Sequence, residues 1–371
     1  SLRNTNQGSD LPNASYKGKG GHNRGKNFGM DFFNTFKKGL ELTGGYSGSD
    51  NESYSASSTR QDYFPSESYQ SKIYENENHS WSESSSHSVN TRFSYEISEK
   101  DRISFSPSFS LRKSDSRSIR LGNSIQDGDT LNITNAKSQN HNDSYSFGGN
   151  FSWMHGFAKR GRTLTINGNI NVSDTKSDGI QQDSSIINKR DTLRNLINST
   201  KSFSNSLTGS VSYSEPLTEH ARLSFNYSLS YSQDESDKES ISYKDALFTE
   251  IIGIDTSLTN KISNTRINNS IGVNYNYYKE KFSFNGGGSI NLSSEENKYE
   301  YLNAPDSLVK NNYLNLSPQF NFNYSLTERS NLNFSYNGNT SSPSASQLQD
   351  VLDVSDQLSV SKGNPDLKKT F

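Results

Sequence analysis

Strict alternation of apolar and polar residues constrains this chain more than any other feature of its sequence. In residues 164–173, 223–231 and 282–292, every second residue is apolar or glycine, and the residues between them are mostly Ser, Asn or Thr. Because successive side chains of a strand point to opposite faces, each segment is predicted to be a β-strand with one apolar and one polar face. No helical period competes over these stretches.

The predicted strands come in pairs joined by short turns. The turns fall near residues 38, 99, 159, 217, 279 and 327. Polar stretches without alternation separate the pairs and are expected to be long loops, at residues 62–77, 115–142, 174–199, 234–263 and 295–310. The order of strand, short turn, strand and long loop therefore repeats six times, which predicts about 12 strands.

The polar composition decides between the architectures that alternation allows. Only 29% of residues belong to the set AVILMFWYC, and mean hydropathy is -0.90. Such a composition often means disorder, but 11% aromatic residues and a net charge of -2 argue against that. A soluble β-sandwich would need a thicker apolar core. A β-solenoid would have shorter repeats and no long loops confined to one side.

An outer-membrane β-barrel satisfies both the alternation and the composition. Hydrocarbon requires every backbone polar group to pair, and a wet interior lets one face of each strand be polar. Short turns at one end and long loops at the other are typical of these barrels. Tyr95, Tyr213, Tyr277 and Tyr324 lie at strand ends near the short turns, as an interfacial aromatic girdle requires. We therefore predict an all-β, antiparallel, transmembrane up-and-down barrel in the outer membrane of a Gram-negative bacterium.

The barrel interpretation predicts faces and sides. Residues expected to face lipid are Leu164, Ile166, Ile170 and Val172, and those expected to face the lumen are Thr165, Asn167, Asn169 and Asn171. Turns expected in the periplasm lie near Glu99, Arg160, Thr218, Glu280 and Glu328. Loops expected outside the cell lie around Glu67, Gln126, Asp183, Ala246 and Ala304.

A motif near the C-terminus carries a family resemblance. Residues 342–348 read Ser-Pro-Ser-Ala-Ser-Gln-Leu, and a second element follows as Gly363, Asn364, Pro365, Asp366, Leu367 and Lys368. These elements resemble the "PS..QL…GNP(N/D)LKP" stretch of TonB-dependent receptor barrels, especially those abundant in Bacteroidetes, with Lys369 in place of the usual Pro. The opening residues 20–29 are also similar to the start of such barrels. In physical terms the second element predicts a structural turn, because Gly permits positive φ and Pro fixes φ.

The resemblance implies a large barrel that serves as a receptor. A barrel of this family has about 22 strands, so residues 1–371 are expected to form an open part of one barrel domain. Residues 1–25 are expected to be a Gly-rich polar lead-in, and residues 341–371 an extracellular loop that leads to the next strand. The alternative is a complete 12-stranded barrel. Phe371 ends no alternating segment and is expected to be a point of truncation.

The implied function is binding or uptake of an unidentified solute across the outer membrane. Expected partners are outer-membrane lipid and lipopolysaccharide, with a TonB-type energy-coupling protein acting through a plug domain that this sequence does not show. The alternative is a structural or adhesive surface barrel that transports nothing. A net charge of -2 argues against a nucleic-acid surface.

Motifs for catalysis, cofactors or metals are not found. The chain has no Cys, and its six His residues form no HExxH motif. His79 and His87 lie near Glu75, Glu77 and Glu83, but a solvated loop explains them better than a metal site. We therefore expect no enzyme, no cofactor and no metal site, although the existence of twelve-stranded outer-membrane lipases leaves an enzyme as an alternative.

Overall fold

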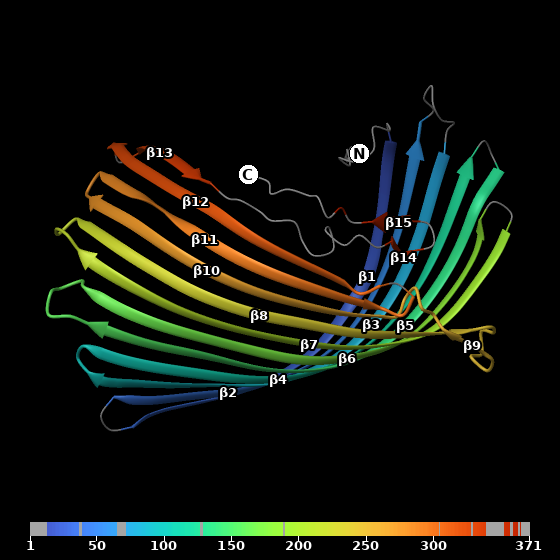
Figure 1. Ribbon diagram of the computed structural model, residues 1–371, viewed down its shortest axis with the longest axis horizontal. Helices are drawn as coiled ribbons and strands as arrows, with labels where there is room; N and C mark the ends of the chain where they lie inside the picture. The colour runs from blue at the N-terminus through green and yellow to red at the C-terminus, as the bar shows by residue number, and fades with distance from the viewer. Residues whose placement is uncertain are drawn as a thin grey trace.

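The computed structural model describes residues 13–36, 39–64, 72–126, 129–187, 190–303, 305–327, 329–338, 352–356, 359–362 and 364. Its main element is one large, strongly twisted antiparallel sheet (Figure 1). The strands of this sheet are β1 (Asn13–Phe36), β2 (Leu40–Tyr63), β3 (Lys72–Ser98), β4 (Asp101–Gln126), β5 (Asp129–Gly156), β6 (Thr163–Ile187), β7 (Arg190–Pro216), β8 (Ala221–Tyr243), β9 (Ile251–Ile254), β10 (Asn260–Lys279), β11 (Phe282–Tyr301), β12 (Ser307–Thr327) and β13 (Ser330–Asn337).

Each long strand pairs with the next one in sequence, which confirms the up-and-down topology. The order runs from β1 to β8 and on through β10 to β13, with the short β9 added beside β8. Among the described residues, β1 pairs only with β2 and β13 only with β12, so the sheet is open (Figure 1). The 12 strands of this path and the open sheet agree with the sequence-based prediction, and the closed 12-stranded alternative is wrong.

The strands are much longer than the alternation predicts. β3, β4, β5, β6 and β7 contain 27, 26, 28, 25 and 27 residues. The stretches 115–142, 174–199 and 295–310 that were expected to be loops are mostly strand, and so is the first half of 234–263. The loop prediction is therefore wrong for these stretches, whereas a long connection, residues 244–259 with the short β9 in it, does lie between β8 and β10. Beyond the alternating segments, pairs of polar side chains on neighbouring strands allow the hydrogen-bonded ladder to continue although neither face is apolar.

Parts of both expected terminal segments are strand. Residues 13–25, predicted as a lead-in, belong to β1. Within residues 341–371, β14 (Leu352–Asp356) and β15 (Ser359–Lys362) pair as a separate two-stranded sheet. Gly363 and residues 365–368 of the family motif lie outside the described residues, as does the expected truncation point at residue 371.

The predicted short turns are confirmed. Two residues separate β3 from β4 and β10 from β11, and four separate β7 from β8. Between β5 and β6 the amide of Arg162 donates to the carbonyl of Lys159, at 3.0 Å. Gly161 beside it has a φ of 84°, a left-handed conformation that a glycine adopts at little cost.

The register places apolar residues of neighbouring strands side by side on one face. One continuous row of directly opposed residues contains Phe36, Leu40, Tyr95, Ile103, Trp153, Ile166, Val211, Tyr227, Ile271, Ile290 and Leu316. A row on the opposite face contains Ser47, Ser88, Ser110, Ser146, Ser173 and Ser204. We call the face of Ile166 the outer face and the face of Ser110 the inner face.

Exposure distinguishes the two faces. On β11, Glu295, Asn297 and Tyr299 of the inner face are 3%, 1% and 4% exposed. Glu296 and Lys298, between them on the outer face, are exposed. Side chains crowd together on the concave side of a curved sheet, so this alternation indicates that the inner face is the concave one.

The apolar part of the outer face is short and regular. It covers residues 103–111, 145–153, 164–172, 223–231, 282–292 and 314–324. These stretches, the spanning segments, are 9 to 11 residues long, and a tilted transmembrane strand needs about that length. The rest of each strand, away from the short turns, we call the outer extension. The described residues contain no helix that combines the length and apolarity of a membrane span.

Candidate functional site

Hydroxyl groups line the inner face. Ser110 and Ser146 pair through their hydroxyls at 2.6 Å, and Ser118 and Ser138 do so at 2.8 Å. Further pairs join Ser47 to Ser88, Ser49 to Ser86, Ser144 to Thr175 and Thr208 to Ser230. Each hydroxyl can both donate and accept a hydrogen bond, so this face can solvate water or a polar solute along its length.

A more specific polar cluster lies on the inner face of β10 and β11. The Arg266 Nη2 atom lies 2.7 Å from Glu295 Oε1, and Asn264 donates to the Asn297 side-chain carbonyl. Arg266 Nε, Glu295 Oε2 and Asn297 Nδ2 are buried and have no hydrogen-bond partner among the described residues. Buried polar atoms of this kind normally bind water or another polar group.

Charged residues cross the outer extensions in one row, which we call the charged belt. Its directly opposed members are Lys113, Asp143, Lys176, Lys201, Asp237, Lys261 and Glu300. On β4 and β5 the belt begins two residues beyond the spanning segments 103–111 and 145–153. The outer face therefore changes abruptly from apolar to ionic.

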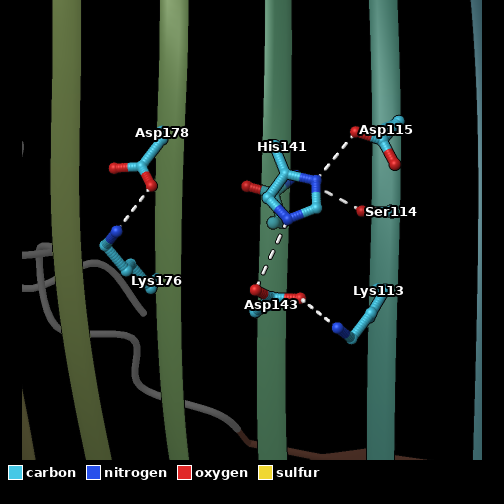
Figure 2. Close-up of polar contacts among 8 residues, drawn as sticks. Lys113, Ser114, Asp115, His141, Asp143, Lys176 and Asp178 are labelled. Atoms are coloured by element: carbon cyan, nitrogen blue, oxygen red, sulfur yellow. Dashed lines mark hydrogen bonds and ion pairs between the residues drawn. The ribbon is translucent and has the colours of Figure 1, made fainter.

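His141 lies opposite Asp115, in the row next to the charged belt, and contacts one carboxylate of each row (Figure 2). Its Nδ1 lies 2.8 Å from Asp115 Oδ1, and its Nε2 lies 3.4 Å from Asp143 Oδ2. The hydrogen bond to Asp115, helped by the charges of Asp115 and Asp143, raises the pKa of His141 above its ordinary value. His141 lies beyond the spanning segment of β5, in the water-exposed part of the outer face.

Two lysines in the charged belt face each other. Lys176 and Lys201 are directly opposite on β6 and β7. Lys176 binds Asp178 on its own strand at 2.7 Å (Figure 2), and Lys201 stands opposite Asp237 of β8. Like charges directly opposite each other destabilise a sheet unless a counter-charge lies between them.

A groove of about 680 Å³ lies on the outer extensions of β3 to β7. Its lining side chains on the outer face are Trp81, Glu83, Asp115, Arg117, Gln139, His141, Asp178, Ile180 and Ile197. The Arg117 guanidinium carbon lies 5.9 Å from the centre of the Trp81 ring. The groove therefore combines an aromatic surface with hydrogen-bond donors and acceptors of both charges.

The histidines considered for a metal site lie on a strand rather than on the expected loop. His79 pairs with Glu77 at 2.7 Å and with the Tyr54 hydroxyl at 2.9 Å, while His87 pairs with the Tyr46 hydroxyl at 2.7 Å. Across the described strands no group of three His, Cys, Asp or Glu side chains could hold a metal ion.

The predicted aromatic residues near the short turns lie where they were expected on the outer face. Tyr213 contacts Phe157, and Tyr277 contacts Phe282, with ring centres 6.2 and 5.5 Å apart. Sequence reasoning missed the charged belt and the groove, although Lys113, Asp115 and Arg117 carried a signal. These charged residues alternate with serines, so they repeat with the two-residue period of a β-strand.

Comparison with known proteins supports the barrel assignment. Residues 155–371, more than half of the chain, match the model of the outer membrane protein beta-barrel family. The chain belongs to this family. Membership places the chain in the outer membrane. In a barrel of this kind we expect the apolar face of each spanning segment to meet lipid and the polar face to line the interior. A search of curated proteins found no match to this chain.

Solved structures with some likeness include three outer-membrane proteins. The siderophore receptor PiuA from Acinetobacter baumannii has 8% identity and a TM-score of 0.29, over 88% of this chain and 71% of that one. The ferric preacinetobactin receptor BauA from the same organism has 8% identity and a TM-score of 0.32, over 88% and 61%. The outer membrane protease OmpT from Escherichia coli has 11% identity and a TM-score of 0.25, over 80% and 95%. These likenesses add nothing to the family assignment.

Proposed function

We propose that this chain forms the barrel wall of a receptor or transporter that takes up a polar solute across the outer membrane. The supporting observation is the hydroxyl-lined inner face, with Ser110–Ser146 and Thr208–Ser230 behind the spanning segments and Ser118–Ser138 in the outer extensions. A barrel that only anchored a surface structure would have no use for hydroxyl pairs along its inner face from β2 to β8. The interior of a transporter must replace the hydration shell of its solute, which paired hydroxyls and amides do well.

The energy for uptake comes, in this proposal, from a TonB-type protein acting through a plug domain. The chain itself contributes a passive, polar wall and no catalytic group. The solute class follows from the wall, whose Ser, Asn and Thr side chains favour a hydrogen-bonding solute over an apolar one.

The test compares a deletion strain with strains complemented by wild-type protein or by an S110F/S146F variant. These two serines oppose each other on the inner face, so the variant adds bulk inside the barrel without touching the lipid-facing side. Solutes remaining in a complex growth medium are measured by mass spectrometry. We expect at least one polar solute to stay in the medium of the deletion strain, to be consumed again with wild type, and to be consumed more slowly with the variant.

A second candidate is an adhesive surface barrel, which one observation favours. The 244–259 segment exposes Leu247 (83%), Ile251 (63%) and Ile252 (68%) at the end of the sheet opposite the short turns. Exposed apolar clusters often mark contact sites for other proteins. A medium whose solutes are consumed equally by the deletion and wild-type strains would favour this candidate and contradict uptake.

A further inference from the structure

We propose that the polar cluster on the inner face of β10 and β11 binds the α-amino acid head group of a zwitterionic solute. This inference rests on the proposed function, because it assigns a binding site to the solute that the barrel takes up. Glu295 of the cluster lies only three residues beyond the spanning segment 282–292 of the same strand. A solute that travels through the barrel interior past this segment therefore meets the cluster.

Three directly opposed residues each carry an unpaired polar atom. Arg266 of β10 stands opposite Glu295 of β11, and Glu295 stands opposite Asn311 of β12. The atoms Arg266 Nε, Glu295 Oε2 and Asn311 Nδ2 are buried and have no hydrogen-bond partner in the described strands. Asn297, two residues along β11 on the same face, adds a fourth such atom, its Nδ2. These four side chains thus offer three hydrogen-bond donors and one acceptor.

The Arg266–Glu295 ion pair uses only part of the bonding capacity of its two charged groups. A single contact of 2.7 Å, from Arg266 Nη2 to Glu295 Oε1, joins them. The side chain of Glu295 is 4% exposed, so its second oxygen is removed from water without a partner. An unpaired atom of a buried charged group costs more free energy than one of a neutral group. An occupant that brings an opposite charge to both groups therefore recovers the most free energy.

An α-amino acid head group matches these four atoms in charge and in hydrogen bonds. Its carboxylate accepts from Arg266 Nε, Asn297 Nδ2 and Asn311 Nδ2, and its ammonium group donates to Glu295 Oε2. The ion pair and the head group each have no net charge, so binding leaves no charge uncompensated. A solute with only a carboxylate would add a second negative charge beside Glu295. An uncharged solute would form weaker hydrogen bonds to the same atoms.

Arg266 provides access to the site. Its side chain is 41% exposed, so it is the member of the ion pair that the barrel interior reaches. Rotation about the torsions of this long side chain opens the ion pair while both strands keep their register. Binding is therefore compatible with a rigid barrel wall.

The test is equilibrium dialysis of protein extracted from outer membranes in mild detergent. The probe is an equimolar mixture of the common L-amino acids, and mass spectrometry measures how much of each compound the protein retains. Two matched mixtures contain the same amino acids with the α-amino group acetylated or with the α-carboxyl group converted to an amide. Wild type is compared with E295Q and with the control E296Q, which removes a negative charge from the neighbouring, exposed residue on the outer face.

We expect wild type to retain at least one free amino acid and to bind its acetylated and amidated forms about tenfold more weakly. E295Q should weaken binding of the free amino acid about tenfold, and E296Q should leave it unchanged. Modified forms that bind as tightly as the free amino acid, or equal losses in the two variants, would overturn the proposal. Far-UV circular dichroism shows that each variant retains the sheet.

Retention of no amino acid by wild type would also overturn the proposal. That outcome is distinct from a failure of the uptake function, which the growth-medium experiment tests without assuming any solute. The comparison of the three mixtures on wild type needs no variant, so it decides the question even where E295Q does not fold.

Discussion

β6 contains two regions that share a strand, a face and hydrogen-bonding neighbours but differ completely in side chains. Its spanning segment presents Ile166, Ile170 and Val172, and its outer extension presents Lys176 and Asp178. The ladder continues unbroken from one to the other, from Thr163 to Ile187. Backbone pairing therefore determines where the strand runs, while the surrounding medium determines which side chains its outer face carries.

If the outer extensions lie outside the cell, protease added to intact cells should reach the connections at their ends and should not reach the short turns. We expect a specific cleavage site inserted between residues 127 and 128, or between 188 and 189, to be cut when protease is added to intact cells. The same site inserted between Glu99 and Lys100, or between Glu280 and Lys281, should remain uncut, because these short turns lie in the periplasm.

Gel analysis of the labelled protein gives the answer, and cells with a permeabilised outer membrane provide the control in which every site is cut. Cleavage confined to the short turns would reverse the orientation. The cleavage sites are placed between strands, and not at Gln126 or Asp183 where loops were expected, because both residues belong to strands.

An arginine introduced on the outer face should lower the free energy of unfolding much more in the spanning segment than in the outer extension. Ile166→Arg lies within the spanning segment and should lower the free energy of unfolding by about 2–4 kcal/mol. Ile180→Arg lies on the same face of the same strand, in the outer extension, and should cost less than about 0.5 kcal/mol because water surrounds it. The measurement is urea unfolding from lipid vesicles. Equal losses at the two sites would place the membrane boundary elsewhere.

Quenching by lipid-attached spin labels should reveal the alternation of faces within the spanning segment. A fluorophore on Ile166→Cys should be quenched several-fold more strongly than one on Asn167→Cys, because only the first position faces acyl chains. The pair Lys176→Cys and Ser177→Cys provides the matched comparison in the outer extension, where neither position should be quenched strongly. Stronger quenching at Asn167 than at Ile166 would exchange the inner and outer faces.

The smallest effect is expected in the 244–259 connection. Backbone amides of Glu250, Thr249 and Leu247 donate to Asp245, at 2.8, 3.1 and 2.8 Å, and hold its pKa below the ordinary 3.8. A lowered pKa means that this stabilisation is present above pH 3.8 and is lost as the pH falls through the lowered pKa. Asp245→Asn should therefore speed amide exchange of these residues several-fold at neutral pH.

Hydrogen exchange measured by mass spectrometry tests this prediction. Wild-type protein should reach the exchange rate of the variant only under acidic conditions, after intrinsic rates are corrected for pH. Exchange in residues 223–231 of β8 and in the paired residues 267–275 of β10 should be the same in both proteins. A variant that loosens those strands as well would show that the connection supports the whole sheet.

Alternation made the spanning segments predictable because hydrocarbon imposes it. Residues 164–172 and 282–292 were recognised correctly for this reason, and so were the short turns that follow or precede them. The outer extensions were not recognised, since water accepts Ser, Asn and charged residues on both faces and leaves no period in hydropathy. The 115–142 region illustrates this failure, because most of it forms the β4–β5 ladder, in which Asp115 stands opposite His141.

The candidate sites required the register as well as the strands. The rows that create the charged belt and the groove join residues far apart in sequence, such as Trp81 to Arg117 and Lys176 to Lys201. A composition of Ser and Asn does not specify which residues stand opposite each other. The polar inner face could be predicted as a face, whereas the Arg266–Glu295 pair on it could not.

The charged belt has a consequence for how the sheet assembles. A strand that slips by two residues keeps its apolar residues on the outer face, and serine rows tolerate such a slip because Ser110 would meet Ser144 in place of Ser146. Asp143 does not tolerate it. In the native register it meets Lys176, but a slip of two residues in either direction sets it against Asp174 or Asp178. The charged belt thus favours a single register between strands whose serine rows would permit several.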